Sequence, residues 1–220
     1  MNKLYARLQR YGLPRLIALL CVVLCVGVVL AALIINDGYW MDWSFSSLGE
    51  VQAPSAPVFN VSLFIASLLL WCIGDVFIDN FKKLHSVSAA KLSGYSFKLL
   101  AICFLGIALF PNDTQHAMHL VFARGMIIVF AAYVILLPIA MPQLPRRVKL
   151  VSYSVIPLAA LLTFQGFFTK SIPFVLFEIL LGALTLGWIY FLGRSVTQHA
   201  KRASTPPTQT VQHSNSEVTS

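Results

Sequence analysis

Long apolar runs alternate with short polar segments from residue 16 to residue 192. A hydrocarbon core about 30 Å thick is crossed by about 20 helical residues at roughly 1.5 Å each, and the apolar runs reach about that length. The pattern predicts an all-α, multi-pass membrane protein, a bundle of six transmembrane helices at about Leu16–Ile35, Val58–Ile78, Ser93–Phe110, His116–Ala140, Val148–Phe168 and Ile172–Leu192.

Polar segments flank this six-helix domain of residues 16–192 on both sides. Residues 1–15 form a basic N-terminal segment, and residues 193–220 are rich in Ser, Thr, Gln and Pro. Because the final segment has little apolar content to bury, we expect it to be a disordered tail.

Composition supports the membrane interpretation. The 220 residues are 58% hydrophobic and 11% charged, whereas an ordinary soluble domain has roughly 45–50% apolar and about 25% charged residues. A water-soluble globule is therefore excluded. All four cysteines lie inside the apolar runs with no zinc or redox spacing, so we expect them to serve packing.

The net charge of +8 raises the alternative of nucleic-acid binding, since clustered bases bind phosphate backbones. The basic residues instead lie at the two termini and in every second connection between spans. This is the positive-inside pattern of a protein with both termini in the cytoplasm. We therefore expect no nucleic-acid partner and a place in the cytoplasmic (inner) membrane. The bases concerned are Lys3, Arg7, Arg10, Arg15, Lys82, Lys83, Lys91, Arg146, Arg147, Lys149, Arg194, Lys201 and Arg202.

Two opposite charges lie at similar depth below the predicted outer face. Arg124 is eight residues, or roughly 12 Å, inside the fourth helix, and Glu178 is six residues, or roughly 9 Å, inside the sixth. An unpaired charge in hydrocarbon costs at least about 2.5–3.5 kcal/mol. We expect an Arg124–Glu178 ion pair, which either fixes the two helices together or lines a polar cavity that opens outward.

The segment joining the third and fourth helices carries a carboxylate and two imidazoles, in Asp113, His116 and His119. These are acceptable metal ligands or proton carriers, while the simpler alternative is a helix cap and interfacial histidines. We expect Pro111 to end the third helix. We also expect His119 to point into the bundle and to hydrogen-bond a polar group of the second helix or of the first outer loop, with His116 more exposed.

The first outer loop, residues 36–57, is long enough to fold back over the bundle. Ser44, Ser46, Ser47 and Gly49 can form a tight turn that presents hydroxyls, and Asn60 lies just below the surface in the second helix. Trp40 and Trp43 suit the membrane interface. No Gly-x-Ser-x-Gly elbow occurs, so a nucleophilic serine is unsupported.

Three motifs stand in a recognisable order: "DWSFSSLG", "APSAPVFN" and "FPNDTQHAMHLVFA". In this order they resemble the six-helix membrane proteins known as domain of unknown function 998 (DUF 998), and more distantly the DRAM and Sfk-type membrane proteins. The likeness covers residues 16–192 and has no settled activity attached to it. The family's motif positions fall on Ser47, Gly49, Phe59, Asn60, Phe110, Pro111 and His119.

Two functions from different classes follow. The first is non-catalytic binding, movement or organisation of a lipid or small amphiphile at an outer polar patch, with membrane lipids as partners and no cofactor. Its candidate ligand-binding residues are Ser44, Ser47, Asn60, His119, Arg124 and Glu178.

The second is a metal-dependent intramembrane hydrolase, for which the comparison is with alkaline ceramidases that hold zinc with three histidines. Here only His116 and His119 are on the outer side, and a carboxylate such as Asp113, Asp42 or Glu178 would have to replace the third imidazole. A further alternative is an assembly or sensory subunit without a ligand. The sequence predicts neither a substrate nor an oligomeric state.

Overall fold

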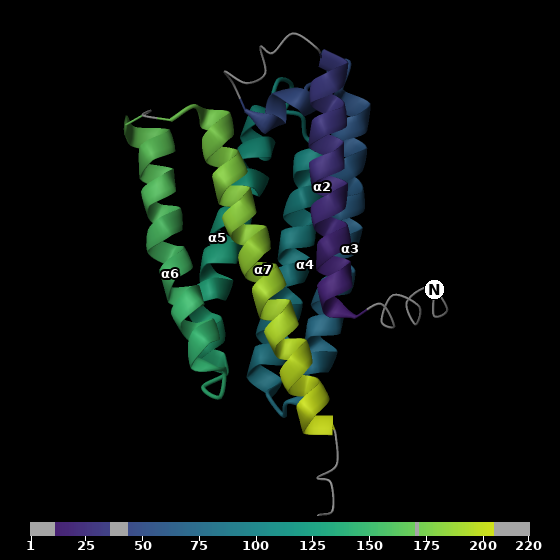
Figure 1. The fold of residues 1–220 in the computed structure, drawn as a ribbon. Helices are drawn as coiled ribbons and strands as arrows, with labels where there is room; N and C mark the ends of the chain where they lie inside the picture. Colours follow the sequence, from purple (N-terminus) through teal and green to yellow (C-terminus); the bar gives the residue numbers. More distant parts are fainter. Residues whose placement is uncertain (1–11, 36–43, 170–171, 205–220) are drawn as a thin grey trace, which may run out of the picture.

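The fold is known from a computed structural model, which describes residues 12–35, 44–169 and 172–204 (Figure 1). The basic residues before residue 12, the expected interfacial Trp40 and Trp43, the candidate ligand Asp42 and residues 205–220 of the predicted tail lie outside the described residues.

Six helices long and apolar enough to cross a membrane make up the described chain, which confirms the predicted all-α, multi-pass fold. A 3-10 helix, η2 (Phe45–Gly49), follows the first span, and a π-helical turn, η3 (Phe164–Thr169), continues the fifth. The spans are α2 (Leu13–Ile35), α3 (Ala56–Lys83), α4 (Val87–Leu109), α5 (His116–Ala140), α6 (Arg146–Thr163) and α7 (Phe174–Ser204).

Proline positions explain two of these boundaries. Pro57 lies in the first turn of α3, where a missing N–H costs nothing. Pro111 follows Phe110, the C-cap of α4, so the expected end of that helix is confirmed. The short turn that follows makes α4 and α5 antiparallel neighbours, as Figure 1 shows.

Helices α2, α3, α4 and α7 are longer than predicted, and α3 and α7 exceed the prediction most. The helix expected to end at Ile78 continues to Lys83, and the last helix continues past Leu192 to Ser204. The segment from residue 193 to residue 204 is therefore helical and not part of a disordered tail. At about 1.5 Å per residue, α7 is roughly 46 Å long, well beyond the thickness of a hydrocarbon core.

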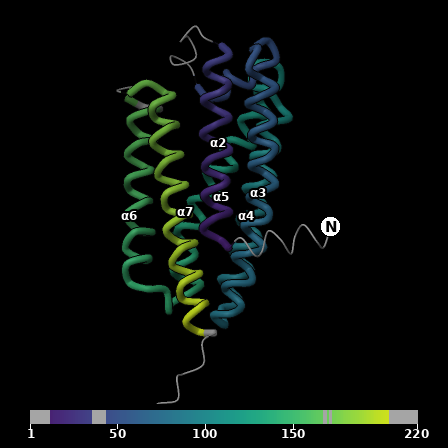
Figure 2. Tube along the Cα trace, turned by 45° about the vertical axis from the view of Figure 1, so that its right-hand side comes forward, coloured from purple at the N-terminus to yellow at the C-terminus, as the bar shows by residue number. Residues whose placement is uncertain are grey.

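Consecutive spans run in opposite directions, and the described ends of the chain, residues 12 and 204, lie at the same end of the bundle (Figures 1 and 2). Helices α2, α3, α4 and α5 pack in sequence, and α7 closes against α2 and α3. Helix α6 stands at the edge, where it packs on α5 and α7.

The two ends of the bundle differ. We call the end that carries η2 and the α4–α5 turn the η2 end, and the end that carries the α3–α4 and α5–α6 turns the basic end. Gly193 of α7 lies against Leu13 and Ile17 at the start of α2. Since α7 continues to Ser204, it projects roughly 16 Å beyond the start of α2 at the basic end.

Aromatic side chains connect the helices in the core. Phe77 stacks on Phe97 with ring centroids 4.9 Å apart, and Tyr133 meets both Phe97 and Trp188 edge-on. Ser93 shares a hydrogen bond of 2.9 Å with the Tyr133 hydroxyl. The Trp188 indole N–H likewise donates to Ser152 Oγ of α6 at 3.0 Å. The polar tips of these rings are therefore satisfied, and one of them fastens the edge helix α6.

Candidate functional site

The chain from residue 44 to residue 55, which we call the η2 segment, folds back over the η2 end of the bundle, as expected from the length of the first loop (Figure 1). Its Leu48 is fully buried and packs in a cluster with Ala31, Phe59 and Leu63. This apolar anchor brings the polar groups of the segment against the ends of the surrounding helices.

Three polar side chains from separate elements hold the backbone of the η2 segment. Glu178 of α7 accepts a hydrogen bond from the Phe45 N–H at 2.6 Å. Asn60 of α3 donates to the carbonyl oxygen of Gly49 at 3.1 Å, and Asp113 of the α4–α5 turn accepts from the Val51 N–H at 3.0 Å. The segment is thus fastened at three points along its length.

The serines of the segment close their own turns. Ser44 and Ser46 share a hydrogen bond of 2.6 Å, and Ser47 Oγ donates to the carbonyl oxygen of Ser44 at 2.7 Å. The fully buried Ser55 donates to the carbonyl oxygen of Leu48 at 2.7 Å. These hydroxyls stabilise the local backbone, which confirms the expected tight turn.

Gly49 allows the segment to approach α3 closely. A Cβ atom at this position would lie 2.5 Å from Asn60 Oδ1 and 2.7 Å from Cδ1 of Phe59. Both distances are shorter than ordinary contacts between nonbonded heavy atoms, whose optimum for carbon is about 3.5–4.0 Å. Any larger residue would have to displace the segment or those side chains.

The expected ion pair between Arg124 and Glu178 is wrong. Arg124 and Glu178 form no salt bridge with each other in the described part of the chain, and Glu178 instead accepts a hydrogen bond from the Phe45 N–H. Arg124 is exposed, and at 100° per residue it lies about 120° around α5 from the buried Phe130. The helix therefore turns Arg124 away from the bundle, and the backbone of η2 provides the partner of the buried carboxyl.

The two histidines are placed as expected in part. His119 is 6% exposed and faces the bundle, whereas His116 is exposed. The expected hydrogen bond of His119 to the second helix or the loop is wrong, because His119 Nδ1 donates to the carbonyl oxygen of Phe110 at 2.9 Å. His119 therefore ties the start of α5 to the end of α4 across Pro111.

The candidate metal ligands are not gathered. Asp113 contacts Val51, His116 Nδ1 bonds Asn112 Oδ1 at 2.8 Å, and His119 bonds Phe110. Among the residues that the structure describes, no three His, Cys, Asp or Glu side chains are close enough together to hold a metal ion.

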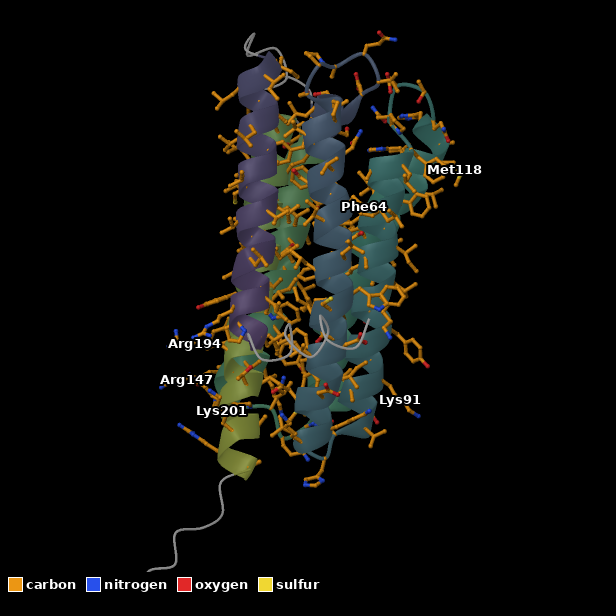
Figure 3. All side chains as sticks on the ribbon, turned by 90° about the vertical axis from the view of Figure 1, so that its right-hand side faces the viewer. Phe64, Lys91, Met118, Arg147, Arg194 and Lys201 are labelled. Atoms are coloured by element: carbon orange, nitrogen blue, oxygen red, sulfur yellow. The ribbon has the colours of Figure 1, made fainter. Side chains whose placement is uncertain are left out.

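An open groove of about 410 Å³ lies on the side of the bundle at the η2 end. Its rim is formed by Gly49 and Val51 of the η2 segment and by Pro111, and Asn60 supplies its polar side chain. Figure 3 shows Phe64 of its wall in the half of the bundle nearer the η2 end. The complete lining is Gly49, Val51, Ala56, Pro57, Asn60, Val61, Phe64, Ala108, Leu109 and Pro111.

Sequence reasoning missed this groove, although it named Asn60, Gly49 and Pro111. Its other lining residues are apolar, and in a membrane protein such residues resemble any surface that faces lipid. Val61, Phe64 and Leu109 are 56%, 46% and 60% exposed, values that equally fit contact with bulk lipid. The groove depends on the position of the η2 segment, and no local sequence pattern predicts that position.

A profile of one protein family, described as "Protein of unknown function (DUF998)", matches residues 19–195. No curated protein and no solved structure matches the chain.

Proposed function

We propose that this protein binds a lipid or another small amphiphile in the groove at the η2 end. The chain belongs to the DUF998 family of proteins of unknown function. The observation that carries this proposal is a groove of about 410 Å³ whose wall residues Val61, Phe64 and Leu109 are exposed on helices apolar enough to cross a membrane. Typical small-molecule sites measure about 300–1,000 Å³ and combine apolar walls with a few fixed polar groups.

The chemistry of the groove supports an amphiphile. Its walls are apolar, and Val61, Phe64 and Leu109 offer exposed surface to an acyl chain. Its polar groups lie toward one end, where Asn60 donates to Gly49 and retains its amide oxygen as an acceptor. A ligand with an apolar chain and a polar head therefore has a matching surface for each part.

The rim is rigid enough to discriminate among ligands. Gly49 and Val51 are both tied by hydrogen bonds, to Asn60 and Asp113. Leu48, the residue before Gly49, is buried in a separate apolar cluster. Because the rim is held in place before a ligand arrives, less ordering entropy is lost on binding.

We also infer that the basic end faces the cytoplasm, so that the groove opens in the outer leaflet of the cytoplasmic membrane. Figure 3 shows Lys91, Arg147, Arg194 and Lys201 together in the half of the bundle at the basic end. An excess of Lys and Arg marks the cytoplasmic side of a membrane protein.

The test is crosslinking of the protein in lipid nanodiscs to a phospholipid whose acyl chain carries a photoactivatable diazirine. We expect the crosslinks to concentrate on the groove residues of α3 and on Ala108 and Leu109. Val61→Trp should remove most of this labelling, because an indole at that position fills the groove.

Val29→Trp is the matched control. Val29 is 55% exposed and lies six residues from the end of α2, while Val61 is 56% exposed and lies five residues from the start of α3. Both substitutions place a tryptophan against lipid at similar depth, but only one lies in the groove. Uniform labelling of every span, or an equal loss in both variants, would reject the proposal.

A further inference from the structure

A second cavity lies at the opposite end of the molecule. It measures about 150 Å³, roughly five times the volume of one water molecule in the liquid, and three separate elements enclose it. Leu84 comes from the α3–α4 turn, and the rest of the lining is Met141, Gln143, Leu144 and Pro145 of the α5–α6 turn with Ser195, Val196 and His199 of α7.

The polar part of this cavity consists of hydrogen-bonding groups without a carboxylate. Gln143 is exposed and carries two amide N–H donors. His199 Nδ1 donates to the carbonyl oxygen of Ser195 at 2.8 Å, so Nε2 is the acceptor nitrogen of the neutral ring and Gln143 supplies the donors considered for a ligand. The turn ends at Pro145, the N-cap of α6, and the first turn of that helix has no acidic residue.

Bases flank every element that contributes to the lining. Lys82 and Lys83 precede Leu84, Arg146 and Arg147 follow Pro145, and Arg194 precedes Ser195. Of the described acids, Asp75 and Asp79 lie toward this end, and Asp75 is already paired with Lys98. The cavity is therefore a hollow in a strongly positive surface. Topology alone explains the number of bases but does not require a hollow with hydrogen-bonding side chains among them.

We propose that this cavity at the basic end binds a phosphate group. Phosphate offers the oxygen acceptors that amide N–H groups and an uncapped helix start favour, and the bases next to the lining residues in the chain add a positive potential. The position suits a lipid headgroup, because α7 projects past the start of α2 into the layer where headgroups lie. Basic pockets between membrane helices bind such headgroups. A soluble phosphate compound offers the same chemistry.

The experiment uses the purified, delipidated full-length chain. Native mass spectrometry counts bound phosphatidylglycerol, with phosphatidylcholine as the zwitterionic comparison, and thermal unfolding is followed with and without inorganic phosphate. We expect one phosphatidylglycerol to be retained. Gln143→Ala should weaken its binding about tenfold, the loss of one hydrogen bond to a charged group. Ser195→Phe, which fills the cavity, should abolish it.

Lys91→Gln is the control. It removes one charge at the same end, but Figure 3 places Lys91 on the opposite side of the bundle from Arg147, Arg194 and Lys201. Retention of phosphatidylglycerol alone identifies a lipid headgroup, and stabilisation by inorganic phosphate that is lost in Gln143→Ala identifies a soluble phosphate ligand. Binding of neither, or an equal loss in Lys91→Gln and Gln143→Ala, overturns the proposal. Because Gln143 lies in an exposed turn, the test stands even if Ser195→Phe does not fold.

Discussion

Glu178 links the last helix to the first loop through a single hydrogen bond to a backbone N–H. Hydrogen bonds to charged groups contribute about 1.5–3 kcal/mol. We therefore expect Glu178→Ala to lower the free energy of unfolding by about that amount, since it leaves the Phe45 N–H without its acceptor. Thermal unfolding of the purified protein in detergent measures the change. Glu178→Gln, which keeps an oxygen acceptor, should lose less.

Glu50 provides the comparison for this experiment. It is a half-buried acid in the same segment, and its described hydrogen bonds come from its backbone: its N–H donates to the carbonyl oxygen of Ser47, and its own carbonyl oxygen accepts from the Ala53 N–H. Glu50→Ala should leave the unfolding temperature nearly unchanged. If both substitutions had the same effect, a general loss of negative charge would explain it better than the hydrogen bond.

The need for a partner at Glu178 was predictable from the sequence, whereas the identity of that partner was not. A carboxyl placed within an apolar span has to be paired or hydrogen-bonded, and Arg124 was the only base at matching depth in another helix. The actual partner is a backbone N–H, a group that every residue except proline carries. A backbone N–H has no sequence signature, so this partner can be identified only from the folded position of the loop.

At the scale of elements, Gly49 sets how closely the η2 segment lies on α3. Gly49→Ala would put a methyl group 2.5 Å from Asn60 Oδ1 and 2.7 Å from the Phe59 ring. Overpacking of this kind costs about 1–3 kcal/mol. We expect a matching loss of stability, together with faster proteolysis of the η2 segment as it lifts from the helix.

Gly182 in α7 is the control for this substitution, because a Cβ atom there meets nothing within 4 Å. Gly182→Ala should be neutral or stabilising by about 0.5–1 kcal/mol, since alanine favours the helix more than glycine does. A stabilising effect of Gly49→Ala would show that the segment has room to adjust.

The ends of helices could be predicted where a proline or the length of the apolar run determines them. They could not be predicted where a helix continues beyond its apolar run. Apolar length ended the last predicted helix at Leu192, yet Leu192, Val196 and Ala200 are all buried. Residues four apart lie on one face of a helix, so this spacing carried the signal for the continuation of α7. The polar residues between them concealed it.

At the scale of the whole molecule, the inferred orientation can be tested by labelling intact cells with a membrane-impermeant maleimide. Gln52 at the η2 end and Arg147 at the basic end are both exposed. We expect Gln52→Cys to react from outside and Arg147→Cys to react only after the membrane is opened. The native cysteines all lie within the spans, and the unsubstituted protein measures their background. The reverse labelling would place the groove in the inner leaflet.

The six-span architecture followed from the sequence because hydrocarbon imposes one length and one polarity on every span. The groove did not, because it requires three segments to meet and its lining is as apolar as the rest of the lipid-facing surface. Of the predicted site residues, Asn60 lines the groove, Asp113 holds its rim and Glu178 fastens the same segment. Arg124 is turned away from the bundle.

The contact between Phe45 and Glu178 joins residues 133 positions apart in the chain. During synthesis, at about 5–20 residues per second, the ribosome needs roughly 7 to 27 s to pass from one to the other. Throughout that interval the first loop has emerged while its fastening on α7 does not yet exist. The fastening on Glu178 can form only after α7 has been inserted, so a chain truncated before α7 would hold the loop through Asn60 and Asp113 alone.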